Sequence, residues 1–340
     1  MAVNIGRPHG VKSQSVNKQV VCFTLSDGRR IDSSNIGSYT QKAAAGDRDA
    51  LYIVGVQHHL GLDVPVDKSV AAQYYLQAAT AGEPHACLEL GYDYDRSLDE
   101  RIAWMEKAAD ADIQQTMTEL AQIYRDQKRD NENALKWFVR SADTFGDQFS
   151  SYCAGHIYQG KQDYENALKY YRLTIENYNA DPTKGDKTMA AGAYRNLGNM
   201  IKSGNIKDYS PDDAFNYYRR AHELDPDQYT SYSLGYCYEN GYGVEQDLHR
   251  AFTLYNASEL PQSRTRVAYM YYYGLGVEQN YEKAVQMLLD LERSHWYIGP
   301  TGKEILARCY RYGRGGLPVD INKAKQYTDK SAAENFAPKQ

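Results

Sequence analysis

Small and apolar residues recur along the chain in a pattern that predicts helices arranged in pairs. A glycine or alanine that follows an apolar residue returns at intervals of 36, 30, 34, 43, 37, 33 and 39 residues, at Gly55, Gly91, Ala121, Gly155, Gly198, Gly235, Ala268 and Ala307. Each is followed downstream by a second landmark, usually an alanine before an aromatic pair, at Ala71, Ala134, Ala167, Ala214, Ala251, Ala284 and Ala324, with Arg101 as the deviant. A unit that returns in this way is typical of stacked structural repeats, so we expect eight units of two helices each.

The residue types within each unit fit two antiparallel helices. A small residue is needed where the helix axes come closest, and the third residue after it lies on the same face. That slot is usually tyrosine, with His58 and Ile201 as exceptions. The glycines of "NGYGV" and "YGLGV" are expected to end the first helix and turn the chain. An Asp or Asn then forms the predicted N-cap of the second helix, at Asp67, Asp163, Asp247, Asn280 and Asp320.

These features resemble Sel1-like repeats, which are relatives of tetratricopeptide repeats. The resemblance covers roughly residues 46–335 and is clearest in 234–255, 267–288 and 306–327, where the small residue, the tyrosine, "GxGV" or a similar turn, and the second alanine all occur. It implies an all-α solenoid of about eight helix pairs, and it implies binding of other proteins without naming one.

Outside the repeats, the segment "QVVCFTLSDGRRI" alternates and contains Asp-Gly, which predicts a β-hairpin. We therefore divide the chain into a flexible segment (1–17), the hairpin with a lead-in helix or cap (18–45), the repeat array (46–335) and a tail (336–340). The hairpin is expected to cover the apolar face of the first repeat. The alternative is an edge strand offered to a partner.

Charge and cysteine content narrow the function classes. The net charge is −5, and residues 1–35 carry five Lys/Arg against two Asp, so the rest of the chain is acidic. This argues against nucleic acid as the main partner. No apolar stretch is long enough for a signal peptide core or a membrane span. The five cysteines are widely spaced, which is typical of a reduced, cytoplasmic protein.

The search for catalytic or ligand-binding motifs returns no site. His58 and His59 have no third ligand nearby at metal spacing, and His58 occupies the tyrosine slot, so we interpret the pair as packing residues. The glycine-rich loops lack the Lys-Ser/Thr of a phosphate loop. We expect no cofactor, no metal and no enzymatic activity, and the oligomeric state stays open.

Tyrosine is unusually abundant, with 32 residues against seven phenylalanines. In repeats of this type the first helix lines the concave surface, and helical spacing from the small residue selects the positions that face it. The partner-binding residues predicted in this way are Tyr229, Tyr232, Tyr236, Tyr269, Tyr272, Tyr273, Arg308, Arg311, Tyr312, Arg195 and Asn199. Tyr238 and Tyr271, in the recurring slot, are predicted to be core residues.

Tyrosine edged by arginine has the composition of protein-binding hot spots. The favoured hypothesis is therefore a non-enzymatic interaction module or scaffold that holds a protein segment in this groove. One alternative is a bacterial immunity protein that blocks a toxin or secreted effector by direct binding. A further alternative is a binder of cell-wall peptides or glycans, or an unrecognised enzyme.

Overall fold

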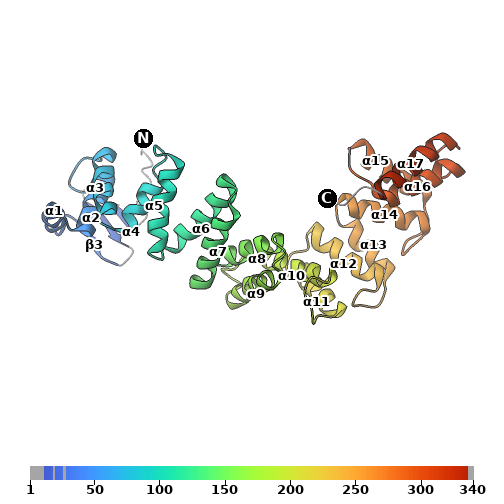
Figure 1. The fold of residues 1–340 in the computed structure, drawn as a ribbon, viewed down its shortest axis with the longest axis horizontal. Coiled ribbons are helices and arrows are strands. Elements are labelled where there is room, and N and C mark those ends of the chain that lie inside the picture. Colours follow the sequence, from blue (N-terminus) through green and yellow to red (C-terminus); the bar gives the residue numbers. More distant parts are fainter. Residues whose placement is uncertain (1–10, 18–19, 26–27, 336–340) are drawn as a thin grey trace. The chain divides into compact units, whose positions relative to one another are not determined.

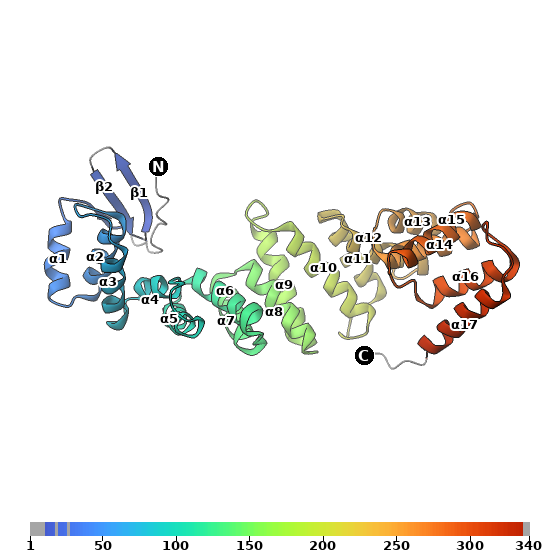
Figure 2. The same ribbon diagram turned by 90° about the horizontal axis from the view of Figure 1, so that it is seen from above.

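The computed structural model describes residues 11–17, 20–25 and 28–335, and within these ranges the chain is an all-α repeat solenoid with a small N-terminal sheet. The chain divides into two compact units, Met1–Phe145 and Gly146–Gln340. Figures 1 and 2 show the helices in each unit as successive antiparallel pairs. No helix of the described ranges is long and apolar enough to cross a membrane.

The first unit opens with an antiparallel sheet in the order β1-β2-β3. Its elements are β1 (Val11–Asn17), β2 (Val20–Leu25), β3 (Arg30–Ile31), α1 (Ile36–Ala44), α2 (Arg48–Leu60), α3 (Lys68–Thr80), α4 (Pro84–Gly91), α5 (Leu98–Asp110), α6 (Gln114–Ile123), a π-helical turn (Tyr124–Lys128) and α7 (Asn131–Phe145). The predicted hairpin is formed by β2 and β3. The strand β1 adds regular structure at 11–17, inside the segment that we expected to be flexible; residues 1–10 lie outside the described ranges.

The sheet packs on the first repeat. Leu25 and Ile31 are 4% and 0% exposed, and both belong to the buried cluster that contains the apolar residues of α2, α3 and α4. Burial of these two side chains removes apolar surface of the first helix pair from water. The sheet therefore shares a buried cluster with the first repeat.

The second unit consists of five further pairs. Their helices are α8 (Gln148–Gly160), α9 (Tyr164–Ala180), α10 (Lys187–Lys202), α11 (Pro211–Leu224), α12 (Gln228–Asn240), α13 (Leu248–Asn256), α14 (Pro261–Tyr273), α15 (Tyr281–Arg293), α16 (Gly299–Tyr312) and α17 (Ile321–Asn335). All five predicted N-caps are confirmed. The side chains of Asp67, Asp163, Asp247, Asn280 and Asp320 each accept a hydrogen bond from a backbone N–H in the first turn of the helix that follows.

The small residues of the repeat lie at the contact between paired helices, as predicted. A Cβ added to Gly235 would lie 3.0 Å from the ring of Tyr255, and one added to Gly198 would lie 2.7 Å from the ring of Tyr218. Gly55 and Gly155 face Tyr75 and Tyr171 in the same way. In each of these four pairs a tyrosine ring of the second helix lies directly against a glycine of the first.

The second glycine of the turn has a role that the sequence analysis did not anticipate. A Cβ added to Gly243 would collide with the carbonyl of Pro211, the first residue of α11 in the preceding pair. Gly276 meets Leu248 at the start of α13, and Gly315 meets Tyr281 at the start of α15, in the same manner. These glycines, which we call the docking glycines, let the turn of one pair contact the backbone of the pair before it.

The four described cysteines, Cys87, Cys153, Cys237 and Cys309, are buried in helices, and none of them is in a disulfide. Burial raises the pKa of the Cys87 and Cys309 thiols to about 11 and that of Cys237 to about 12. Thiols that remain protonated in this way pack as small apolar groups. The fifth, Cys22, has no described side chain.

Candidate binding face

The predicted binding residues lie in the second unit, on the first helix of each of four successive pairs. These helices are α10, α12, α14 and α16, and α10 contacts α12 while α14 contacts α16. The tyrosines of α12 are partly exposed: Tyr229 is 48% exposed, and Tyr232 and Tyr236 are half-buried. Their rings are therefore held at one end and open at the other, which is the arrangement that suits tyrosine.

Cations of α10 connect this helix to α12. The guanidinium of Arg195 lies 5.1 Å from the ring centre of Tyr229, and the amine of Lys202 lies 4.3 Å from that of Tyr236. Contacts of this kind between a cation and a ring are attractive, by about 0.5–1 kcal/mol at exposed sites. They order the two tyrosine rings at the side of α12 that faces α10.

A second set of contacts continues from α12 to α14. Arg266 of α14 approaches Glu239 of α12 at 3.4 Å, and its guanidinium lies 5.9 Å from the ring of Tyr269. Burial raises the pKa of Tyr232, and the charge of Arg266 opposes that shift, so these two side chains are neighbours as well. Tyr269 in turn contacts Tyr273 with ring centres 4.7 Å apart.

The chain of contacts ends on α16. Burial raises the pKa of the Tyr273 hydroxyl, and the nearby guanidinium of Arg308 opposes that shift. Arg308 also pairs with Glu304 one turn away, at 2.6 Å. The structure thus brings together residues of four helices, which we call the tyrosine face: Arg195, Asn199, Lys202, Tyr229, Tyr232, Tyr236, Arg266, Tyr269, Tyr273 and Arg308.

Three predicted residues do not join this face. Tyr272 is only 3% exposed; its ring packs on Tyr281 at 5.1 Å, and its hydroxyl accepts a hydrogen bond from Arg314 at 3.2 Å. A buried ring cannot offer its surface to a partner, so Tyr272 is left out of the tyrosine face. Arg311 and Tyr312 are exposed at the end of α16, and no contact among the described residues joins them to it.

Tyr238 and Tyr271 are half-buried rather than fully enclosed. Each lies edge-on against a phenylalanine of the preceding pair, Tyr238 against Phe215 at 5.6 Å and Tyr271 against Phe252 at 5.3 Å. They pack between neighbouring repeats. Three tyrosines of second helices, Tyr171, Tyr218 and Tyr255, are enclosed more completely, since all are 0% exposed.

Each enclosed tyrosine hydroxyl is satisfied by a polar side chain of the first helix. Tyr255 donates to Glu239 at 2.7 Å, Tyr218 donates to the Asn199 amide oxygen at 2.8 Å, and Tyr171 donates to Gln159 at 2.6 Å. Burial raises the pKa of all three hydroxyls well above the usual value. The buried tyrosines therefore position polar side chains such as Glu239 and Asn199 on the first helices.

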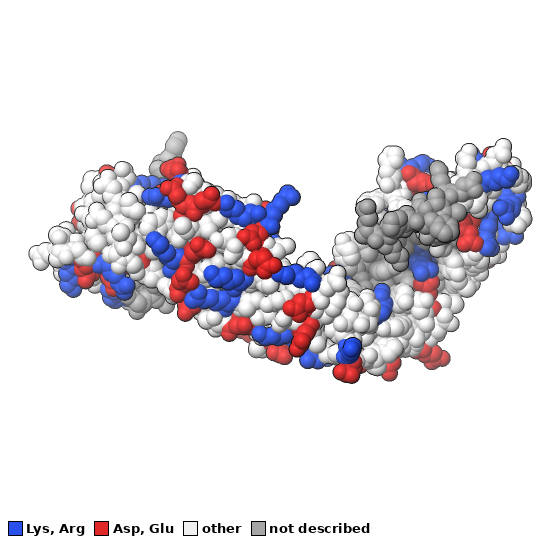
Figure 3. All heavy atoms as spheres, in the orientation of Figure 1, with Lys and Arg blue, Asp and Glu red and all other residues white. Residues whose placement is uncertain are grey.

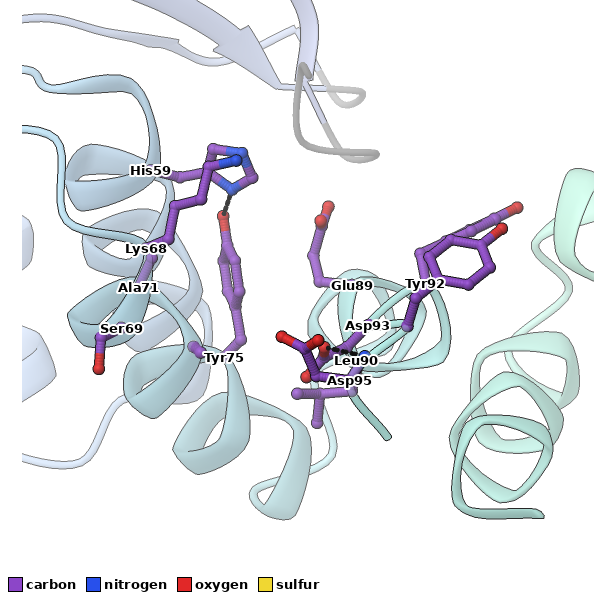
Figure 4. Close-up of a pocket in the computed structure, with 12 residues that line it drawn as sticks. His59, Lys68, Ser69, Ala71, Tyr75, Glu89, Leu90, Tyr92, Asp93 and Asp95 are labelled. Atoms are coloured by element: carbon purple, nitrogen blue, oxygen red, sulfur yellow. Dashed lines mark hydrogen bonds between the residues drawn. The ribbon is translucent and has the colours of Figure 1, made fainter. Parts of the chain in front are cut away.

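The first unit contains a hollow that the sequence analysis missed. It has a volume of about 640 Å³, with His59 and Tyr75 on one side and Glu89, Asp93 and Asp95 on the other (Figure 4). His59 Nδ1 lies 3.2 Å from the Tyr75 hydroxyl, which agrees with the interpretation of the two histidines as packing residues; His58 stacks on Tyr74. Glu89 comes from α4, and Asp93 and Asp95 come from the start of the segment "DYDRSLDE". The acidic composition of this segment did not indicate that it lines a hollow with α4.

Charges of both signs alternate over α5, α6 and α7 (Figure 3). Arg140 pairs with Asp110 and Asp112, both at 2.9 Å, and Lys128 pairs with Asp99. On the face shown in Figure 3 these helices carry no basic stripe of the kind that binds a phosphate backbone.

The chain matches the Sel1 repeat family over residues 48–83, 84–113, 115–143, 150–179, 191–225, 230–258, 261–289 and 305–336. These eight segments agree with the eight units found from the landmark spacing. The search of curated proteins gave no match.

Among solved structures, the chain is similar to c5321, a protective antigen of uropathogenic Escherichia coli strains with an SLR fold (22% identity, TM-score 0.59, 88% of this chain and 64% of that one). It is also similar to a Sel1 repeat protein from Oxalobacter formigenes (20% identity, TM-score 0.58, 88% of this chain and 86% of that one). The chain thus spans less than two thirds of the length of c5321. At these identities the likeness shows the fold.

Immunity protein Pa5087 from Pseudomonas aeruginosa matches 56% of this chain and 74% of its own, with 17% identity and a TM-score of 0.28. A TM-score of this size carries no argument for an immunity role.

Proposed function

Because the chain belongs to the Sel1 repeat family, whose repeats typically mediate protein–protein interactions, we propose that it is a non-enzymatic binding module that holds a protein segment on the tyrosine face. One observation carries the proposal. Partly exposed tyrosines of α12 and α14 lie beside cations: Tyr229 and Tyr236 beside Arg195 and Lys202 of α10, and Tyr269 beside Arg266 of α14. Tyrosine held in this way offers rigid contact area at low entropic cost.

The packing of the face supports binding rather than a purely structural role. Rings that serve only the core are enclosed, as Tyr255 is at 0% exposed, whereas Tyr229 leaves 48% of its surface open. Holding a large ring partly in water forgoes apolar burial, and a partner that covers it would recover that burial. Hot spots of protein interfaces are enriched in tyrosine and arginine for this reason.

The test introduces a photo-crosslinking amino acid at Tyr236 and, separately, at Tyr269. The matched control is Tyr94, a tyrosine of the first unit that is 78% exposed. In extract of the source cells we expect one defined protein to crosslink at the two face positions and not at Tyr94.

The partner identified in this way is then titrated against point variants. Tyr236→Ala or Tyr269→Ala is expected to weaken binding about tenfold or more, while Tyr94→Ala leaves the affinity unchanged. Wild-type affinity in both face variants would contradict the proposal. The partner's own activity separates a scaffold from an inhibitor.

A further inference from the structure

Three hydrogen-bond donors form a row along α10 at one edge of the tyrosine face. Arg195, Asn199 and Lys202 are spaced four and three residues apart, which places them on one side of the helix. The Asn199 amide oxygen accepts the Tyr218 hydroxyl at 2.8 Å, so its nitrogen is the group left to donate. We call these three residues the donor row.

The acceptors near this row are engaged elsewhere. Glu239 accepts from Tyr255 at 2.7 Å and approaches Arg266 at 3.4 Å. Asp227 caps α12 by accepting from the Thr230 N–H at 2.6 Å, and its distance to Arg195 is 3.9 Å. Neither carboxylate reaches Lys202.

Lys202 is the most distinctive member of the row. Among the described residues it has no ion pair, and its charge is compensated by the Tyr236 ring at 4.3 Å. The side chain is half-buried, and burial lowers its pKa. Partial removal of a cation from water without a counter-charge costs free energy. A carboxylate of the ligand that pairs with Lys202 would offset this cost.

The arginines of the face differ from Lys202, because each has an acidic partner within the chain, as Arg195 has in Asp227. Arg308 pairs with Glu304 at 2.6 Å, and Arg266 pairs with Glu239 at 3.4 Å. Among the described cations of the face, the charge without an acidic partner is therefore that of Lys202 on α10. A ligand that crosses from α10 to α14 would meet donors first and aromatic surface next.

We propose that the donor row receives the side-chain carboxylates of an acidic segment of the bound protein, whose apolar portions lie on the tyrosine face. The inference rests on the proposed binding function and names the chemistry of its ligand. Arg195 and Lys202 are about 10 Å apart along the helix axis, which matches carboxylates three residues apart in a polyproline II segment, where every third side chain lies on the same side and three residues span about 9 Å. Arg195 can hold a carboxylate through two nitrogens, and Lys202 acts as a point charge.

The test uses a fluorescent decapeptide, acetylated and amidated, with glutamate at every third position, and the same peptide with glutamine in place of glutamate. Lys202→Gln removes the charge. The matched control is Lys283→Gln. Lys283 also lies over a tyrosine ring, 5.2 Å from the ring centre of Tyr271, but it belongs to the second helix α15 and not to the donor row. Fluorescence anisotropy of the full chain gives the affinities.

We expect the glutamate peptide to bind saturably and more weakly as salt is raised, and to bind at least tenfold more weakly to Lys202→Gln than to wild type or Lys283→Gln. The glutamine peptide should bind at least tenfold more weakly than the glutamate peptide to the wild-type chain. Equal binding of the two peptides, no binding of the glutamate peptide at millimolar concentration, or unchanged affinity in Lys202→Gln would each overturn the inference. If the crosslinked partner depends on Tyr236 but not on Lys202, the inference fails while the proposed function stands.

Discussion

Two groups of tyrosines in the second unit differ in position and in environment. Those on the second helices, Tyr171, Tyr218 and Tyr255, are fully enclosed, lie on a glycine of the first helix and donate to one of its polar side chains. Two tyrosines of the first helix α12, Tyr229 and Tyr236, are partly exposed and lie beside cations. One residue type therefore serves two purposes in adjacent helices.

The difference explains why phenylalanine is so rare here. An enclosed phenylalanine would fill the same space, but it could not hydrogen-bond to Glu239 or Asn199. On the exposed helices a phenylalanine would present an apolar edge to water. The high tyrosine content of the chain is thus due partly to the core and partly to the proposed binding surface.

Replacing Gly235 with leucine should have the largest effect on the enclosed group. The new side chain would begin 3.0 Å from the Tyr255 ring and would force the two helices apart, at a cost of about 3 kcal/mol in the free energy of unfolding. Gly160→Leu is the control, because Gly160 is also helical but has open space around it. Urea denaturation followed by circular dichroism measures both, and equal midpoints would show that the glycine slot is not tight.

Replacing Tyr255 with phenylalanine tests the hydroxyl alone. The ring stays in place, but Glu239 loses the hydrogen bond at 2.7 Å, so we expect a loss of about 1–2 kcal/mol in the free energy of unfolding. Tyr229→Phe, in the partly exposed group, should change it by less than about 0.5 kcal/mol. The same denaturation experiment compares the two. A larger loss for Tyr229→Phe would reverse the assignment of the two groups.

Alkaline pH should destabilise the fold through the enclosed group. Burial raises the pKa of Tyr171, Tyr218 and Tyr255 in the folded chain, whereas in the unfolded chain these hydroxyls ionise near pH 10. Their contribution to stability is therefore complete below about pH 10 and is lost as the pH rises above it, by about 1 kcal/mol per tyrosine within the first unit of pH. Urea midpoints from pH 8 to 11 measure the loss. Tyr255→Phe should lose stability less steeply over this range than wild type, and identical slopes would contradict the account.

The repeat architecture could be predicted from sequence because it depends on local spacing. The landmark intervals located all eight helix pairs, and the N-cap positions followed from single residues such as Asp247 and Asn280. The choice of which tyrosines are enclosed could not be made in this way. Tyr238 and Tyr255 both lie on a helical face that meets other helices. Of the two, the ring of Tyr255 is the one that packs against Gly235.

The binding residues were only partly accessible to the same reasoning. Helical register selected one side of each first helix, and on that side Arg195 lies beside Tyr229. Register could not show that Tyr272 is covered by the turn into α15, because that depends on how Tyr281 and Arg314 fold over it. Nor could it identify Lys202 as a cation without an acidic partner, since that depends on which neighbours Glu239 and Asp227 already bind.

The docking glycines bear on how the second unit comes apart. Gly243, Gly276 and Gly315 each place one turn against the backbone at the start of the preceding second helix, so neighbouring pairs share a close main-chain contact. In a repeat protein, cooperativity depends on the strength of such nearest-neighbour interfaces relative to the stability of each repeat. From α10 to α17 a pair that opens must break this contact with its neighbour. This segment should therefore unfold in larger cooperative blocks than single repeats, and proteases should find few partly opened forms to cut there.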